Sequence, residues 1–204
     1  MTGAIHIDLF TTLDGVAQSP GGRSEDPDDG FAYGGWQAPL DDDAVGERVM
    51  AGIRRMDALL LGRRTYDIFA GYWPQYQGPG VEIADRFNAI PKYVASRGNP
   101  DLPWRGSHLV GPDLAAEVAT LRKRHEEVHV VGSIDFARTL VRERQFDVLN
   151  LWVYPLVLGP GKRLFPSDGP ALGLTLLEPP VAGTAGALLL RYGPGPEVTT
   201  AEMG

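Results

Sequence analysis

A glycine, two arginines and a threonine occupy positions 62–65, directly after the apolar residues 59–61. The change from an apolar run to these residues indicates a strand that passes into a helix. The first residues of a helix have free backbone N–H groups and the positive end of the helix dipole, and both attract anions. Gly62-Arg63-Arg64-Thr65 is therefore a predicted phosphate-binding site.

Two further apolar segments end in residues of the same kind. Ser96-Arg97 follows residues 92–95, and Gly132-Ser133 follows residues 128–131. Ligands of open α/β sheets bind outside the carboxyl ends of the strands, so three such ends predict a dinucleotide along the sheet edge. Three guanidinium groups favour NADPH over NADH, because they can bind an additional phosphomonoester: Arg63, Arg64 and Arg97.

Strand-like and helix-like segments alternate along most of the chain, which predicts an α/β fold with a mostly parallel sheet covered on both faces. The expected strands span residues 4–10, 58–61, 92–95, 108–110 and 128–131. The expected helices span residues 41–55, 65–69 and 82–88, with two more after Asp113 and near Phe136. Residues 148–154, 174–177 and 187–192 read as strands joined by turns, so antiparallel pairing is expected there.

Length and composition favour one domain over residues 1–193, with a disordered tail at residues 194–204. The 204 residues include 19 basic and 26 acidic side chains, and no dense basic segment indicates a nucleic-acid partner. The chain has no cysteine, which excludes disulfides and thiolate ligands. Neither a signal-like start nor a long apolar run is present. We therefore expect a cytoplasmic protein without a membrane partner.

The candidate residues outside the strand ends have two interpretations each. Asp14, in an Asp-Gly turn, either caps the turn or contacts substrate. Trp36, in the long polar loop of residues 16–40, either fills the core or stacks on a planar substrate. His125 and His129 have no third ligand nearby in sequence, so no metal site is expected and both are predicted at the surface or a strand edge. The aspartates within residues 25–29 and 41–43 are predicted to be solvated charges of a loop and a helix start.

Five segments, taken in order, carry a family resemblance. They are Phe10-Thr11-Thr12-Leu13-Asp14-Gly15, Leu60-Leu61-Gly62-Arg63-Arg64-Thr65-Tyr66, Asn88 with Pro91-Lys92-Tyr93-Val94-Ala95-Ser96, Val130-Val131-Gly132-Ser133, and the run from Tyr154 to Phe165. Their order resembles the dihydrofolate reductase-like superfamily, and within it the reductase (C-terminal) domain of the riboflavin-biosynthesis enzyme RibD and its stand-alone relatives. The resemblance covers residues 4–192.

The resemblance implies a three-layer α/β/α fold, NADPH as cofactor and a homodimer joined through the C-terminal strands. It places Asp14 beside the nicotinamide and the substrate. It leaves Gly46 near the position where dihydrofolate reductases have an acid, with Asp43 as the neighbouring candidate catalytic carboxylate beside Asp14. The implied cofactor-binding residues are Gly62, Arg63, Arg64, Thr65, Ser96, Arg97, Gly132, Ser133, Ile134 and Phe136.

The preferred hypothesis is a stand-alone NADPH-dependent reductase that transfers a hydride to a small ring-bearing or ribityl-type molecule. Asp14 and Trp36 are its candidate substrate contacts. One alternative is a catalytically silent module that binds NADPH or another ligand. A second is a true dihydrofolate reductase, which the glycine at position 46 disfavours. A full riboflavin-pathway reductase needs a phosphate-binding group for its substrate, and Lys162 and Arg163 are the available basic residues.

Overall fold

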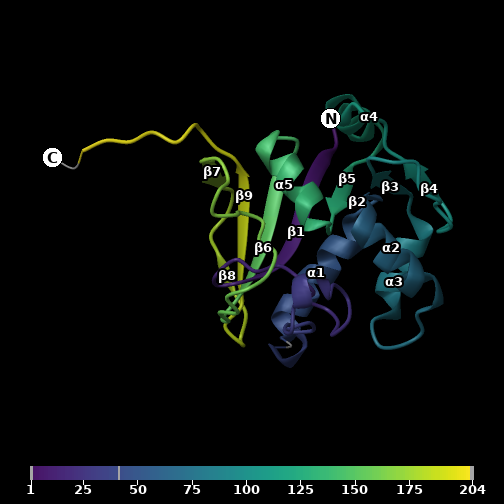
Figure 1. Ribbon diagram of the computed structural model, residues 1–204, viewed down its shortest axis with the longest axis horizontal. Helices are drawn as coiled ribbons and strands as arrows, with labels where there is room; N and C mark the ends of the chain where they lie inside the picture. The colour runs from purple at the N-terminus through teal and green to yellow at the C-terminus, as the bar shows by residue number, and fades with distance from the viewer. Residues whose placement is uncertain (1, 41, 203–204) are drawn as a thin grey trace.

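The computed structural model describes residues 2–40 and 42–202, which form one mixed sheet with helices on both faces (Figure 1). The strands are β1 (Ala4–Thr12), β2 (Ala58–Gly62), β3 (Lys92–Ala95), β4 (Ser107–Leu109), β5 (Glu127–Val130), β6 (Val148–Tyr154), β7 (Leu174–Leu176), β8 (Val181–Ala182) and β9 (Leu188–Pro194). The helices are α1 (Asp43–Arg55), α2 (Arg63–Tyr72), α3 (Val81–Ala89), α4 (Leu114–Arg124) and α5 (Ile134–Arg142). Short 3₁₀ turns cover Asp28–Gly30, Ala38–Leu40 and Trp73–Gln75.

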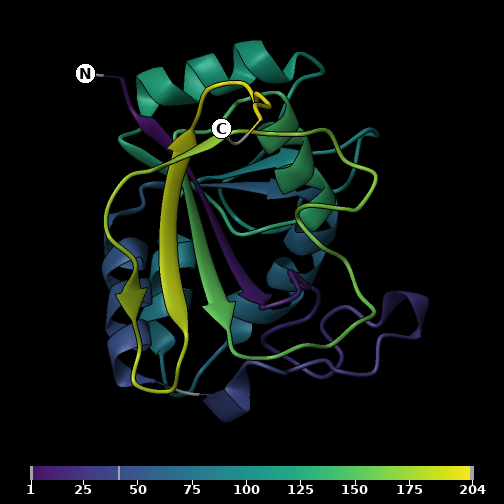
Figure 2. The ribbon, with the colours of Figure 1, turned by 90° about the vertical axis from the view of Figure 1, so that its left-hand side faces the viewer.

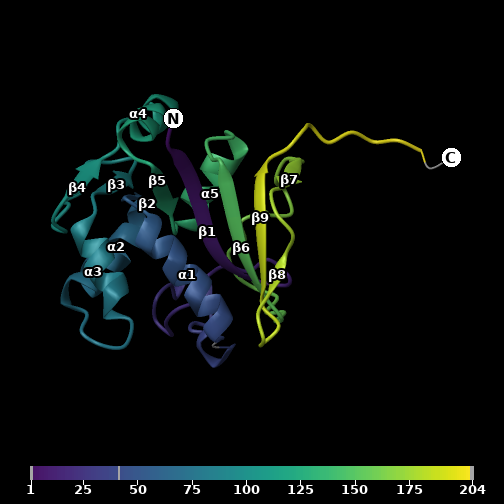
Figure 3. The same ribbon diagram turned by 180° about the vertical axis from the view of Figure 1, so that it is seen from behind.

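The strand order is β4-β3-β2-β5-β1-β6-β9-β7, and β8 pairs with β9. Figures 1 and 3 show β4 at one edge and β7 at the other. The strands from β4 to β6 run parallel, whereas β9 is antiparallel to β6, β7 and β8. The predicted fold class is confirmed, including the antiparallel C-terminal strands.

Apolar and polar side chains alternate along much of β1, so the two faces of the sheet differ in character. Ile5, Ile7 and Leu9 are buried in a core that includes residues of α4 and α5. Side chains alternate along a strand, so His6, Asp8 and Phe10 lie on the opposite face. Gly52 of α1 packs near His129 on that face, and Figure 2 shows α1 and α5 on opposite sides of the strands.

Trp36 belongs to a smaller core on the α1 face. Its side chain is only 7% exposed and its ring packs edge-on against Tyr154, with 5.6 Å between centroids. Its Nε1 donates to the backbone oxygen of Gln18 at 2.9 Å. Trp36 therefore fastens the long loop to β6, which is the core interpretation of this residue; a substrate contact stays a prediction.

The C-terminal strand continues slightly beyond the domain boundary expected from the sequence. β9 ends at Pro194, the N–H of Gly195 donates to Gly173 O at 3.0 Å, and Arg144 Nη1 donates to Gly195 O at 2.7 Å. The following described residues form no regular element and lead away from the sheet in Figure 1. No helix of the described chain has both the length and the apolar character to cross a bilayer.

Candidate functional site

Two helices begin side by side at the carboxyl ends of adjacent strands. β2 passes into α2 through its N-cap residue Gly62, and β5 leads into α5 through the N-cap residue Ser133. β2 and β5 are neighbours in the sheet. Neither N-cap residue accepts a hydrogen bond from its helix through its side chain, so the first N–H groups of both helices are free to bind an anion.

Glycines at positions 62 and 132 allow the two helix starts to touch. The N–H of Gly62 donates to Gly132 O at 3.0 Å. A Cβ on Gly62 would lie 2.2 Å from Ser133 Oγ and 2.9 Å from Ser133 N. Gly132 has φ of 140°, and its Cβ would lie 2.5 Å from Thr65 Oγ1. Any larger residue at either position would therefore push the two loops apart.

Arg63 and Arg97 are exposed cations at this edge. Arg63 Nε lies 2.6 Å from Asp67 Oδ1 one helical turn later, and both side chains are more than 40% exposed. Arg97 follows β3 and makes no ion pair with any described residue. Ser96 Oγ accepts a hydrogen bond from the N–H of Gly98 at 3.2 Å. Both guanidinium groups can turn toward a ligand at little cost, because exposed ion pairs are weak.

Arg64 is held by the long acidic loop instead of standing free. Its guanidinium lies 2.9 Å from Asp26 Oδ1 and also contacts Asp28. Lys162 Nζ lies 2.7 Å from Asp26 and 2.9 Å from Asp28. Hydrogen bonds from Arg64 and then Lys162 lower the pKa of Asp28. Asp26 is only 8% exposed, so the prediction that the loop aspartates are solvated is wrong for this residue.

Asp14 caps the turn that follows β1. Its carboxylate accepts from the N–H of Leu158 at 3.2 Å and of Gly159 at 2.8 Å, and from the Thr12 hydroxyl at 2.5 Å. Partial burial opposes the charge, but the hydrogen bonds outweigh it and lower the pKa of Asp14 to about 2. Arg163 Nη2 lies 3.3 Å away. The structure thus shows the capping role, while substrate contact and catalysis by Asp14 stay predictions.

The start of α1 carries the other candidate carboxylate. Asp43 is the first residue of the helix and is exposed. The N-cap is Asp42, whose carboxylate accepts from the N–H groups of Ala44 at 3.0 Å and Ala185 at 2.6 Å. These backbone hydrogen bonds, that from Ala185 foremost, lower the pKa of Asp42. Asp42 is only 5% exposed, so the prediction of a solvated charge is wrong for this residue, and Asp41 lies outside the described residues. At Gly46 a Cβ would meet no atom within 4 Å, so the glycine is not required by packing there.

The two remaining cofactor candidates lie on the first turn of α5. Ile134 is its first residue and is partly buried. Phe136 packs against the main core, and its Cβ lies 2.9 Å from where a Cβ of Gly62 would be. Phe136 therefore contributes to the contact between the two helix starts.

His129 is buried in the sheet, so its predicted place at the surface or a strand edge is wrong. It is 2% exposed, and its Nδ1 lies 2.7 Å from Asp8 Oδ2. Although burial opposes the charge, the Asp8 carboxylate raises the pKa of His129. The sequence carries no local sign of this environment, because the neighbours His6 and Asp8 come from β1, more than 100 residues away, and meet His129 only through strand pairing. His125 Nε2 forms a hydrogen bond with Tyr93 Oη at 2.9 Å.

A mixed sheet with this strand order, a glycine contact between two helix starts and arginines at the edge define a protein of the dihydrofolate reductase-like fold. The model of the RibD C-terminal domain matches residues 4–183, and the chain belongs to this family.

Three proteins illustrate the similarity. The uncharacterized protein YyaP of Bacillus subtilis (strain 168) is 26% identical over 168 residues, which are 79% of each chain. The structure of a pyrimidine reductase-like protein from Corynebacterium diphtheriae has a TM-score of 0.63 and 16% identity, covering 96% of this chain and 93% of that one. Dihydrofolate reductase from Enterococcus faecalis, complexed with NADP(H) and RAB-propyl, has a TM-score of 0.55 and 14% identity, covering 96% and 99%.

Proposed function

We propose that this protein is an NADPH-dependent reductase of a small organic molecule. The observation that carries the proposal is the meeting of two helix N-termini, at Gly62 and Ser133, without side-chain caps. Their N–H groups and dipoles provide binding for a pyrophosphate. Membership of the RibD C-terminal domain family supports the same cofactor, because the family is one of reductases that use NAD(P)H.

The described residues fit such a dinucleotide. The helix starts would bind the pyrophosphate, while Arg63 and Arg97, both exposed, would bind the phosphomonoester that distinguishes NADPH from NADH. NADPH, when bound, supplies the hydride. The protein's contribution is to hold and orient the reactants and to limit the access of water.

The substrate would lie between the end of β1, the start of α1 and the long loop. Ion pairs from Asp26 and Asp28 to Arg64 fasten this loop to α2, and Trp36 fastens it to β6. The family resemblance puts Gly46 near the position where a dihydrofolate reductase has its acid. On this proposal the substrate is therefore one whose reduction needs little protonation from that position. A small ring-bearing or ribityl-type electrophile is the substrate class that we infer.

The test is a titration of the protein with NADPH and with NADH, followed by fluorescence. We expect tighter binding of NADPH, and Arg97→Ala should weaken it by about 1.5–3 kcal/mol, the contribution of a charge-assisted hydrogen bond. Arg142→Ala is the matched control, because Arg142 lies at the far end of α5 and pairs with Glu143. Equal affinity for the two nucleotides would contradict the NADPH assignment.

Turnover distinguishes an enzyme from a silent binding module. NADPH oxidation is measured with panels of pterins, flavin precursors and quinones. Binding of NADPH without oxidation by any of these compounds would favour the silent module. Oxidation that Arg97→Ala reduces through a higher KM for NADPH would support the reductase.

We also propose a homodimer through the C-terminal strands. Leu176, Leu177 and Leu188, on or next to the C-terminal strands β7 and β9, are 46%, 49% and 38% exposed, and exposed apolar side chains are suited to an isologous interface. Light scattering should give about twice the chain mass of 22.1 kDa. A monomer at micromolar concentration would contradict this proposal.

A further inference from the structure

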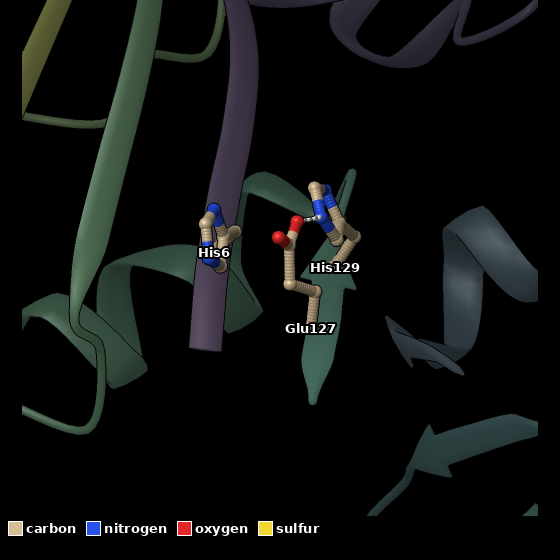
Figure 4. A group of neighbouring side chains, drawn as sticks. All are labelled: His6, Glu127 and His129. Carbon is tan, nitrogen blue, oxygen red and sulfur yellow. Dashed lines mark hydrogen bonds and ion pairs between the residues drawn. The ribbon is translucent and has the colours of Figure 1, made fainter. Parts of the chain in front are cut away.

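Three side chains that can bind a metal ion converge on the α1 face of the sheet, where β5 pairs with the first residues of β1. They are His6, Glu127 and His129, and one nitrogen or oxygen atom of each lies within 4.8 Å of the others. Glu127 and His129 share a face because they are two residues apart on β5, and His6 is the cross-strand partner of His129. Figure 4 shows the three side chains directed toward one another.

His129 is already oriented as a metal ligand. Its Nδ1 lies 2.7 Å from Asp8 Oδ2, which leaves Nε2 facing Glu127 Oε2 at 3.4 Å. Asp8 is fixed in turn, because Asn150 Nδ2 donates to its other oxygen at 2.7 Å. Arg191 Nε donates to Asn150 Oδ1 at 2.9 Å. A carboxylate behind a histidine in this way selects the tautomer and raises the basicity of the ligating nitrogen.

His6 is buried without a hydrogen bond. The residue is 7% exposed, and its ring stacks on His129 with 4.7 Å between centroids and 16° between planes. Among the described residues, neither of its ring nitrogens has a hydrogen-bond partner. Wholly buried side-chain atoms without a partner are, among the described residues, Trp73 Nε1 and Ser107 Oγ, so the unpartnered ring nitrogens of His6 keep some access to solvent. A lone pair of His6 is therefore available to bind a metal ion.

We propose that His6, Glu127 and His129 bind a divalent transition-metal ion of the zinc class. Two imidazoles and one carboxylate are ligands that suit Zn²⁺, Co²⁺ and Ni²⁺, whereas Mg²⁺ and Ca²⁺ prefer all-oxygen sites. Ligand bonds of about 2.0–2.1 Å in a tetrahedron place neighbouring donor atoms about 3.3 Å apart. The 3.4 Å between His129 Nε2 and Glu127 Oε2 matches this separation.

Arg55 competes with such an ion for Glu127. Its Nε lies 3.2 Å from Glu127 Oε1 and 3.3 Å from Oε2, at the last residue of α1. The Arg55 side chain is 55% exposed, so this ion pair is weak and can be displaced. The metal affinity should therefore rise when Arg55 is replaced by glutamine.

The metal site is separate from the proposed cofactor site. His129 precedes Gly132 by three residues, and its β2 partner Leu59 precedes Gly62 by three. Three residues of a strand span about 10 Å, and the two sites share no residue. The metal-site proposal therefore does not depend on the proposed reductase activity and can be tested without it.

The experiment uses the full chain, freed of metal by a chelator and then titrated with Zn²⁺ against a chromophoric indicator. We expect one ion per chain, with His6→Gln and Glu127→Gln each weakening binding by at least 100-fold. Asp8→Asn, which changes only the group behind His129, should weaken it by about 10- to 100-fold. His108→Gln is the matched control, because this exposed histidine lies outside the cluster.

Co²⁺ provides a second readout, since tetrahedral coordination by nitrogen and oxygen gives visible absorption that His6→Gln should abolish. Circular dichroism verifies that each variant is folded, and Glu127→Gln, at a partly exposed position, provides the result if His6→Gln fails to fold. Absence of stoichiometric Zn²⁺ binding by the wild-type protein would overturn the proposal. Equal weakening by His108→Gln and Glu127→Gln would overturn it as well.

Discussion

Basic side chains are exposed at the carboxyl ends of the strands of this sheet and buried toward their amino ends. At the carboxyl ends, Arg63 and Arg97 are exposed, and the proposed binding groups are backbone N–H groups of two helix starts. At the amino ends, His6 and His129 are buried, and each depends on side chains of neighbouring strands. Lys92, the first residue of β3, is also fully buried.

The difference shows how the environment determines what a charged group can do. An exposed arginine keeps its charge and can turn toward an incoming anion, so the carboxyl end is suited to binding a phosphate. A buried imidazole or amine keeps a fixed orientation, but its charged form loses hydration and is therefore less favourable in free energy. Burial, and then the neighbouring His129, lowers the pKa of His6, whereas the Asp8 carboxylate raises that of His129. A metal ion at the amino end would bind His6 as a neutral imidazole and would replace the proton of His129.

The largest expected effect concerns catalysis at the carboxyl end. We expect dihydrofolate turnover about 10²- to 10⁴-fold below the ordinary range of about 1–10³ per second, because the family resemblance puts Gly46 near the position where a dihydrofolate reductase has its general acid. The measurement is steady-state NADPH oxidation with dihydrofolate, for wild type and for Gly46→Asp, whose new side chain meets open space. Wild-type turnover in the ordinary range would indicate that another carboxylate, such as Asp43, supplies the proton.

A second prediction concerns the contact between the two helix starts. Gly62→Ala would place a Cβ 2.2 Å from Ser133 Oγ and 2.9 Å from Phe136 Cβ, so we expect a loss of about 1–3 kcal/mol in the free energy of unfolding together with weakened NADPH binding. Gly71→Ala in α2 is the control, since no atom lies within 4 Å of its Cβ position. It should stabilise the helix by about 0.5–1 kcal/mol. Both are measured by denaturant unfolding.

A third prediction concerns the buried amine at the amino end. Lys92 Nζ donates to the backbone oxygens of Asn88 at 3.0 Å and Arg105 at 3.1 Å. Burial, and then the charge of Arg105, lowers the pKa of Lys92 to about 8 from 10.5. Between these two values the unfolded chain binds more protons than the native protein, so the free energy of unfolding should rise with pH, by about 3 kcal/mol in total.

The rise is detected by urea unfolding at a series of pH values from 7 to 11. Lys92→Met should abolish it, because this variant has no amine to titrate. Lys123→Met should retain it, since Lys123 is exposed on α4. A wild-type profile that matches Lys92→Met would mean that Lys92 titrates normally and that the amino end is better hydrated than its burial indicates.

The carboxyl end could be predicted from the sequence because each of its parts is a short contiguous segment that follows an apolar strand. Gly62-Arg63-Arg64-Thr65 occupies one turn, and a strand-to-helix change fixes its position. The amino end could not, because His6 and His129 meet only through the parallel pairing of β1 and β5. The ion pairs of Arg64 escaped prediction for the same reason, since Asp26 reaches it from a loop without periodicity.

The smallest expected effect tests whether Arg64 shares the properties of the other arginines at the carboxyl end. Asp26 and Asp28 occupy its guanidinium as a phosphate would. Ion pairs at partly exposed sites are worth up to about 1 kcal/mol, so the double variant Asp26→Asn with Asp28→Asn should bind NADPH about 2- to 5-fold more tightly at low salt. The gain should shrink at high salt, where the charges are screened.

The matched control for this variant is Asp101→Asn with Asp168→Asn, which removes the same charge from two exposed positions. Both double variants raise the net charge equally, so a general attraction of NADPH to a less acidic protein would affect them alike. Isothermal titration of the two variants and wild type separates this general attraction from release of Arg64. Unchanged affinity in the Asp26 and Asp28 variant would show that Arg64 only anchors the loop, because freeing its guanidinium would then add nothing to phosphate binding.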